Sequence, residues 1–267
     1  MYNFNYARPG TVADAAVALA AGAQTRVIVL AGGQTLIPTM KQRLTQPGGL
    51  IDLAGIGELR GIHKAGNAIG IGAMTTHAEV AGNADIRASL PALASLAQGI
   101  ADPMVRNRGT IGGSLANNDP AADYPAAVLA LGATIVTNKR QIKADDYFKG
   151  LFTTALEAGE IITGIGFPVA DKAGYAKFEQ RASRFALVGV FVAKIGQAVR
   201  VAVTGAGDGG VFRSLPHEQA LAASWSPASA AAVKLPASNL MGDMHGSADY
   251  RASLISVMAE RAVVAAG

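Results

Sequence analysis

The sequence predicts an α+β protein with more than one domain, and three observations indicate this class. Residues 27–44 have the pattern of a strand, a glycine turn and the start of a helix. Short β-rich runs at 58–62 and 68–73, separated by a turn, precede a long helical stretch. Three further β-rich runs and two helical segments follow residue 171. At 267 residues and 50% hydrophobic composition, the chain is long enough to form two cores.

The N-terminal elements are expected to alternate between helix and strand. Thr11, with an aspartate three positions later, predicts a capped helix over 12–21. The β-branched run 27–30 predicts a strand, and Pro38 suits the first turn of the helix after it. The apolar run 50–53 predicts a second strand, which should be parallel to the first because a helix intervenes.

The middle of the chain has mixed signals. A T-x-x-E pattern at 76–79 predicts a helix start, and an apolar helix is expected over about 124–131. Residues 134–138 and 160–168 predict strands. The polar, turn-rich stretch 168–174 is the expected domain boundary.

The C-terminal third predicts three antiparallel strands backed by helices. The strands correspond to the β-rich runs YAKFEQR, ALVGVFVAKI and AVRVAVTG. Helices are expected at 217–224 and over 248–265, where apolar residues recur at helical spacing.

Composition excludes several kinds of chemistry. The chain has no cysteine, which excludes disulfides, thiolate nucleophiles and an iron–sulfur cluster held by this chain alone. Its four histidines are scattered, so no metal site is expected. The net charge of +4 is dispersed, which argues against nucleic-acid binding. Without a signal pattern or an apolar run of membrane-spanning length, a cytoplasmic protein is expected. Redox chemistry would need an organic cofactor.

Two glycine pairs are the main candidate binding motifs. Gly32-Gly33 is followed by Thr35, and Gly112-Gly113 is followed by Ser114. Glycine loops before helices let phosphate approach free N–H groups, and a dinucleotide pyrophosphate has two charged groups to be held. The alternative is that both are helix caps, with the two hydroxyls satisfying their own helix ends.

Other candidates are weaker. Gly205, Gly207 and Gly210 match G-x-G-x-x-G, but no long helix follows, so a turn between strand and helix is expected. Asp123 either caps the helix after it or contacts a ribose or flavin group. Arg106 and Arg108 flank the second loop and either meet phosphate or a partner subunit or are simply solvated. His77 is interpreted as a surface residue, and no hydrolytic triad or carboxylate pair is present.

The motifs together resemble a known family. AGGQTLIPTMKQRL (31–44) and TIGGSLANNDPAADYPAAVLALGA (110–133) are similar to the two flavin loops of the FAD-binding medium subunits of molybdenum hydroxylases. That family includes aerobic carbon monoxide dehydrogenase and the flavin portion of xanthine dehydrogenase. The similarity also covers IGAMTTHAEV (71–80), GEIITGI (159–165) and KFEQRASRFALVGVFV (177–192).

The resemblance implies a fold and a division into domains. Residues 1–170 would form a FAD-binding domain of the vanillyl-alcohol-oxidase (PCMH) type, with subdomains of about 1–56 and 57–170. Residues 171–267 would form a small C-terminal domain of three antiparallel strands plus helices.

The resemblance also implies the site. The two loops would hold the pyrophosphate, with Asp123 nearby, Ile100 and Ala101 beside the isoalloxazine ring, and the Ile162 backbone in contact with the cofactor. The family's lysine beside the flavin aligns with Lys177 or Glu179, and Phe185 falls where some members have a tyrosine. No catalytic or metal-binding residue is expected. The expected cofactor-binding residues are Leu30, Ala31, Gly32, Gly33, Gln34, Thr35, Leu36, Ile100, Ala101, Thr110, Ile111, Gly112, Gly113, Ser114, Asn117, Asp123, Ile162, Lys177 and Phe185.

The function implied is electron transfer. In the family, substrate is oxidised at a molybdopterin cofactor on a large subunit, and electrons cross [2Fe-2S] clusters on a small subunit to FAD on the medium subunit. The acceptor would be quinone, NAD or oxygen, and the assembly a dimer of heterotrimers. Two alternatives remain open: a stand-alone flavin oxidase of the same fold and a non-enzymatic assembly protein.

Overall fold

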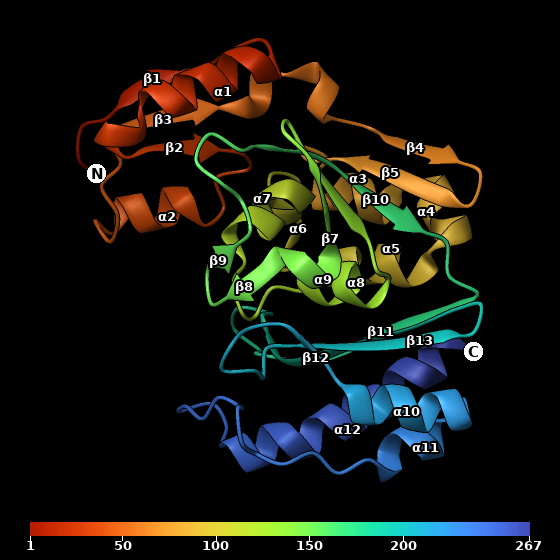
Figure 1. The fold of residues 1–267 in the computed structure, drawn as a ribbon. Coiled ribbons are helices and arrows are strands. Elements are labelled where there is room, and N and C mark those ends of the chain that lie inside the picture. Colours follow the sequence, from red (N-terminus) through yellow and green to blue (C-terminus); the bar gives the residue numbers. More distant parts are fainter.

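The computed structural model describes residues 1–267 and arranges them in three stacked parts (Figure 1). The first part is a parallel sheet in the order β1-β3-β2, with α1 and α2 beside it. Its elements are β1 (Asn5–Ala7), α1 (Val12–Ala21), β2 (Val27–Leu30), α2 (Leu36–Lys41) and β3 (Gly49–Asp52). The capped helix and the parallel pair of strands are confirmed. The exposed strand β1 was not predicted, because three residues without alternation give no signal.

The second part is built on an antiparallel sheet in the order β4-β5-β10-β6-β7. Its strands are β4 (Ile62–Ala65), β5 (Ala68–Gly72), β6 (Thr134–Thr137), β7 (Gln141–Lys143) and β10 (Ile162–Pro168). The hairpin is confirmed, but its first strand begins at Ile62 rather than at residue 58. Residues Gly57–Leu59 form a 3-10 turn instead. Ile56 and Leu59 are both fully buried, and a spacing of three suits such a turn rather than a strand.

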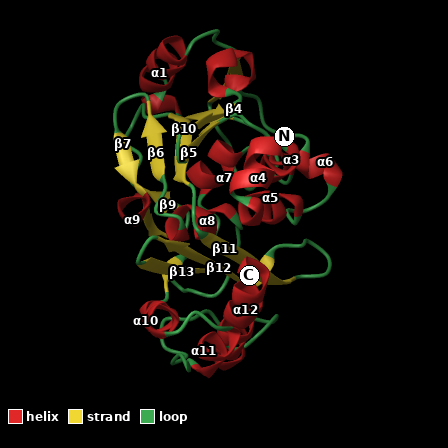
Figure 2. Cartoon of the chain, turned by 90° about the vertical axis from the view of Figure 1, so that its right-hand side faces the viewer, coloured by secondary structure: helices red, strands yellow, loops and turns green.

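Short helices cover one face of this sheet and fill the largest core of the molecule (Figure 2). The helices are α3 (His77–Gly82), α4 (Ala84–Ser89), α5 (Pro91–Gln98), α6 (Pro103–Arg106), α7 (Ile111–Asn117), α8 (Tyr124–Ala130) and α9 (Ala144–Tyr147). A separate two-stranded ribbon consists of β8 (Phe148–Gly150) and β9 (Thr153–Thr154). The predicted T-x-x-E start is a complete capping box between Thr76 and Glu79. The remaining 3-10 turns are Ala23–Thr25 and Leu53–Gly55.

The third part is an antiparallel sheet in the order β11-β12-β13-β14, backed by three helices. Its elements are β11 (Lys172–Glu179), β12 (Ala186–Ile195), β13 (Ala198–Thr204), β14 (Phe212–Arg213), α10 (Leu215–Ala223), α11 (Pro227–Ala232) and α12 (Ala248–Ala266). The three predicted strands are confirmed, and the short β14 adds a fourth. Along β12, Val190 and Val192 face α12 while Phe191 and Ala193 face the middle core, so both faces are buried.

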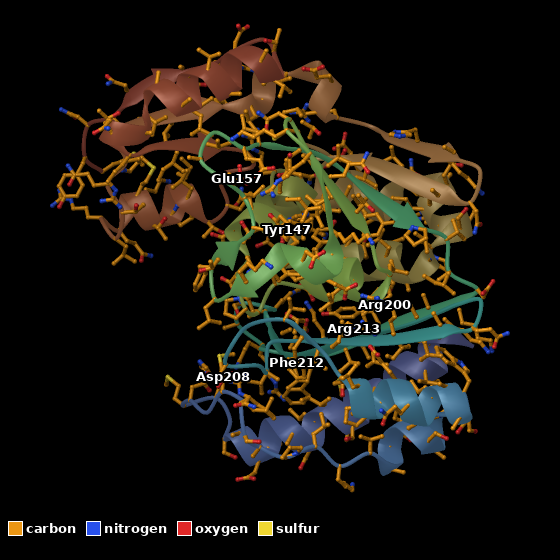
Figure 3. All side chains as sticks on the ribbon, in the orientation of Figure 1. Tyr147, Glu157, Arg200, Asp208, Phe212 and Arg213 are labelled. Carbon is orange, nitrogen blue, oxygen red and sulfur yellow. The ribbon has the colours of Figure 1, made fainter.

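Two arginines join the third part to the second (Figure 3). The guanidinium of Arg200 donates to the Leu129 carbonyl at 2.8 Å and contacts Asp145 at 2.6 Å. Arg213 contacts the same carboxylate at 3.5 Å and pairs with Glu218 at 2.6 Å. These bonds hold the sheet against α8, so β11 has a fixed place beside the helices of the middle part.

No helix is both long and apolar enough to cross a membrane.

Candidate functional site

The first glycine loop connects β2 to α2 and leaves consecutive backbone donors free. Gly33 has a φ of +74°, a left-handed conformation that favours glycine. The N–H groups of Gly32, Gly33, Gln34 and Thr35 donate to no acceptor in the chain. Leu30 ends the strand before the loop, outside this row of donors. Successive free N–H groups around a left-handed residue form a nest that suits an anion.

The second glycine loop is built differently, because its amides serve the fold. The N–H groups of Ile111 and Gly112 donate to carbonyls in the segment 73–75 at 3.1 and 2.9 Å. The hydroxyl of Thr110 accepts from the Gly113 N–H at 3.1 Å and caps α7. Phosphate binding at this loop would therefore rely on side chains rather than on the backbone.

The two hydroxyls after the glycine pairs do not cap their helices, so the alternative interpretation is wrong for Thr35 and Ser114, although Thr110 does cap α7 in the second loop. Neither Thr35 nor Ser114 makes a capping hydrogen bond. The side chains of Ser114 and Asn117, one turn apart on α7, make no hydrogen bond in the chain and are partly exposed. Both remain available to a ligand.

The two loops are in direct contact although they are far apart in the sequence. A Cβ on Gly32 would collide with the Arg108 carbonyl oxygen and the Gly109 backbone. A Cβ on Gly113 would lie 3.3 Å from the Ala31 methyl group. The free N–H groups of the first loop therefore lie beside the start of α7, as a pyrophosphate between two loops requires.

Asp123 is a buried anion bound by two residues of β11. Its Oδ1 accepts from the Tyr175 hydroxyl at 2.6 Å and lies 3.1 Å from the Lys177 ammonium. Burial raises the pKa of Asp123, while the charge of Lys177 opposes that rise. The side chain makes no capping bond to α8. The expectation that it is a simple cap is therefore wrong.

Lys177 also reaches the corner that follows α5. Its Nζ donates to the Gly99 carbonyl at 2.9 Å and to the Arg184 carbonyl at 2.7 Å. Glu179, two residues along the same strand, is exposed and makes no such contact. Of the two candidates, Lys177 is the one that the structure brings to the predicted ring-side residues Ile100 and Ala101.

The corner itself has an unusual backbone. Ala101 has a φ of +42°, which is uncommon for a residue with a Cβ. Arg106 donates from Nη1 to the carbonyls of Ile100 and Ala101 at 2.8 and 2.7 Å, and Arg184 donates to the latter at 3.2 Å. Local strain held by several hydrogen bonds is typical of binding sites.

The remaining predicted residues lie at the margins. Phe185 is 45% exposed, immediately before β12. Ile162 begins β10 with its side chain in the core, so only its backbone is available. Leu36 is the first residue of α2. None of these side chains offers a polar group to a cofactor.

His77 is not a surface residue, so that interpretation is wrong. Its side chain is 6% exposed and packs on Tyr124, with ring centroids 5.3 Å apart. Its Nδ1 has no hydrogen-bond partner. Burial, together with the nearby charge of Arg106, lowers the pKa of His77 to about 4. The Gly109 backbone packs closely against this ring, which explains the burial.

Two residues of the site were not singled out as such from the sequence. Tyr175 lies two residues before Lys177 and so on the same face of β11. Arg106 flanks the second loop and is buried, which its place in the sequence does not indicate. The alternation along the strand was a usable signal for Tyr175. No local signal existed for the arginine.

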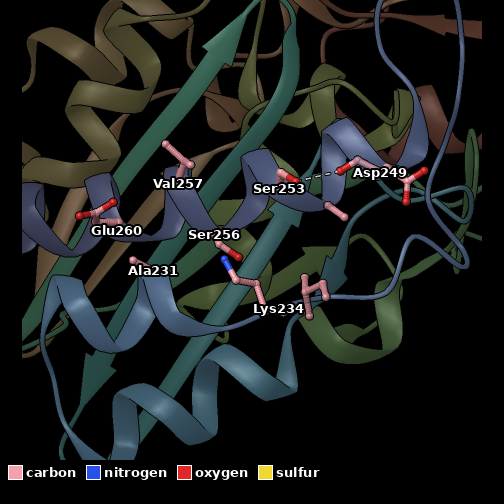
Figure 4. Close-up of a pocket in the computed structure, with 9 residues that line it drawn as sticks. Ala231, Lys234, Asp249, Ser253, Ser256, Val257 and Glu260 are labelled. Atoms are coloured by element: carbon pink, nitrogen blue, oxygen red, sulfur yellow. Dashed lines mark hydrogen bonds between the residues drawn. The ribbon is translucent and has the colours of Figure 1, made fainter.

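Two other regions have features of a binding site but lie apart from the glycine loops. The 205–210 glycines form a turn, as predicted, with the short β14 placed between it and α10. A pocket of about 310 Å³ lies between α11 and α12, lined by Lys234, Asp249 and Glu260 among others (Figure 4). It is remote in sequence from both glycine loops, and its lining includes no buried polar atom without a partner.

The chain is similar to known proteins over nearly its whole length. Residues 2–170 match a family model described as the FAD binding domain in molybdopterin dehydrogenase. The chain is 38% identical to the nicotine 6-hydroxylase medium subunit of Paenarthrobacter nicotinovorans, over 98% of this chain and 96% of that protein. It is also 38% identical to the carbon monoxide dehydrogenase medium chain of Hydrogenophaga pseudoflava, with the same coverage.

Solved structures show the same fold over nearly the whole chain. Carbon monoxide dehydrogenase from Hydrogenophaga pseudoflava superposes with a TM-score of 0.85 at 35% identity, covering 99% of this chain and 97% of that one. Quinoline 2-oxidoreductase from Pseudomonas putida 86 superposes with a TM-score of 0.89 at 29% identity, again covering 99% and 97%.

Proposed function

This chain belongs to the family of FAD-binding medium subunits of molybdenum-containing oxidoreductases, and we propose that its two glycine loops hold the FAD pyrophosphate. The observation that carries the proposal is the run of four free N–H groups from Gly32 to Thr35. Anions bind such donors readily. The contact between this loop and α7 provides a second wall, with Ser114 and Asn117 as its polar side chains.

The flavin ring would lie by the corner at Ile100 and Ala101. Arg106, Lys177 and Arg184 fix the corner carbonyls, and Asp123 holds Lys177 from the other side. Bound flavin supplies the redox chemistry, and the chain binds it, orients it and sets the charge around it. In this proposal residues 1–170, with subdomains of about 1–56 and 57–170, form the FAD domain. Residues 171–267 form a C-terminal domain that contributes Lys177 and Phe185.

The proposed role is electron transfer within a larger assembly. Electrons from [2Fe-2S] clusters on a small subunit would pass through FAD on this chain to quinone, NAD or oxygen, after substrate oxidation at molybdopterin on a large subunit. The absence of cysteine from this chain supports the division of labour, because thiolates are the usual cluster ligands. A dimer of such heterotrimers in the cytoplasm completes the proposal.

The test is to purify the chain through an affinity tag from its natural host. The expected result is co-purification of two other chains, flavin and iron–sulfur absorbance, and about one released FAD per copy of this chain. An active lone chain would instead indicate a stand-alone oxidase. A complex without flavin would indicate an assembly protein and would overturn the proposal.

Variants of the first loop sharpen this test. Thr35→Pro removes one of the four donors and should reduce FAD occupancy, since proline has no N–H group. Pro38→Ala, in the same short helix, removes no donor and should retain FAD. Equal occupancy in the two variants would mean that the pyrophosphate lies elsewhere.

A further inference from the structure

Arg106 is a buried cation that is not among the expected cofactor-binding residues. Its side chain is 9% exposed, and one nitrogen, Nη1, donates to two successive carbonyls at 2.8 and 2.7 Å. No carboxylate pairs with it. A buried charge without a counterion is expensive, so this arrangement needs an explanation.

The effect of these bonds on the backbone supplies one. With the carbonyls of Ile100 and Ala101 drawn to one guanidinium, Ala101 is held at a φ of +42°. An alanine is strained in this region, so surrounding bonds must maintain it. The N–H groups of Ala101 and Asp102 then donate to no acceptor in the chain. The corner therefore presents two adjacent free donors on a fixed backbone.

We infer that Arg106 is a positioning residue for the flavin ring, holding the 100–102 backbone so that the N–H groups of Ala101 and Asp102 meet acceptor atoms of the ring. This inference rests on the proposed function. Fixed donors stabilise negative charge that develops on the group they contact. Arg106 thus acts through the backbone and raises the midpoint potential of the bound flavin.

The chain provides a matched control. Arg251 is 2% exposed, and its Nη1 also donates to two carbonyls, those of Leu187 and Gly205, at 2.8 and 2.6 Å. It lies on α12 and contacts none of the corner residues. Arg106→Met and Arg251→Met each remove a buried guanidinium that bonds two carbonyls, but only the first lies at the corner. Arg251→Met additionally removes an ion pair with Asp243 at 2.7 Å, so its loss of stability should be the larger.

The experiment uses the tagged chain purified with its bound subunits. Flavin midpoint potential is measured by spectroelectrochemical titration, and amide exchange is measured over residues 99–102. In Arg106→Met the equilibrium constant for two-electron reduction should fall about tenfold, a downward shift of about 30 mV, with faster exchange at the corner. Arg251→Met should lose thermal stability without a shift in potential.

The outcomes separate the two proposals. A wild-type complex without flavin overturns the proposed function. Flavin bound by Arg106→Met at the wild-type potential overturns this inference alone. Arg106→Lys keeps a charged donor but not the guanidinium geometry, so it should give a smaller shift in the same direction. If the methionine variant does not fold, an unchanged potential in the lysine variant overturns the inference.

Discussion

The ammonium of Lys177 lies 3.1 Å from the buried carboxylate of Asp123, joining β11 to the residue that precedes α8. The two side chains are 9% and 4% exposed, so neither charge is well solvated. Removing one member of a buried pair leaves the other uncompensated, which costs more than the pair itself contributes. The pair thus links the third part of the fold to the proposed ring site.

Lys177→Met should lower the free energy of unfolding by about 3 kcal/mol, because Asp123 loses its only cation. The measurement is urea denaturation at neutral pH. Lys139→Met is the control, since Lys139 lies 3.9 Å from Glu157 with both side chains largely exposed. That loss should be below about 1 kcal/mol. Similar small losses in both variants would contradict a buried ion pair.

Stability should fall as the pH drops from about 6.5 towards 4, because burial lowers the pKa of two histidines to about 4. They are His77 and His217, and the latter is fully buried on α10. The unfolded chain binds these protons near the ordinary pKa of 6.5, whereas the folded chain does not. Each histidine should therefore reduce the free energy of unfolding by about 2 kcal/mol between pH 7 and pH 5. Stability that these groups contribute is fully present above pH 6.5.

The matched variants are His77→Gln and His217→Gln, each measured by urea denaturation at pH 7 and pH 5. Each variant should reduce the change in the free energy of unfolding between pH 7 and pH 5 by about 2 kcal/mol. An unchanged slope in His77→Gln would mean that this side chain is protonated in the folded state.

The second glycine loop should need glycine at position 112 for packing within the protein. A Cβ on Gly112 would lie 2.6 Å from the Ala73 carbonyl oxygen, inside the protein rather than in ligand space. Gly112→Val should therefore destabilise the fold itself, by about 2 kcal/mol or more. Gly57→Ala is the control, since nothing lies within 4 Å of its added Cβ. The measurement is thermal denaturation without cofactor, which separates destabilisation of the fold from loss of ligand binding. A wild-type melting temperature for Gly112→Val would contradict the prediction.

Local elements could be predicted from the sequence because their signals are local. The helix after Thr11 begins and ends where its cap and glycine predict. The third sheet followed from three β-rich runs, whereas the two-residue β14 is too short to leave a pattern. Strand β4 was placed too early because the apolar spacing at Ile56 and Leu59 belongs to a 3-10 turn.

The site could be predicted only in part, because much of it depends on contacts between distant segments. The glycine pairs were visible, yet only the fold shows that Gly112 packs on Ala73 while the first loop keeps its N–H groups free. His77 is buried because the Gly109 backbone, distant in the sequence, packs on its ring. Arg106 is buried because it turns back onto the carbonyls of Ile100 and Ala101. No periodicity in the sequence encodes those contacts.

Side chains of α7 should divide into those that hold the helix and those that hold a ligand. Thr110 caps α7, so Thr110→Ala should lower the free energy of unfolding by about 1 kcal/mol. Ser114 and Asn117 make no hydrogen bond in the chain, so Ser114→Ala and Asn117→Ala should change stability by less than about 0.5 kcal/mol. Both should nevertheless release FAD more readily, because a polar contact to a bound ligand is lost. The measurements are urea denaturation of the chain and FAD retained by the purified complex during dialysis. If either alanine variant at 114 or 117 lost stability while retaining FAD fully, that side chain would support the helix and not the cofactor.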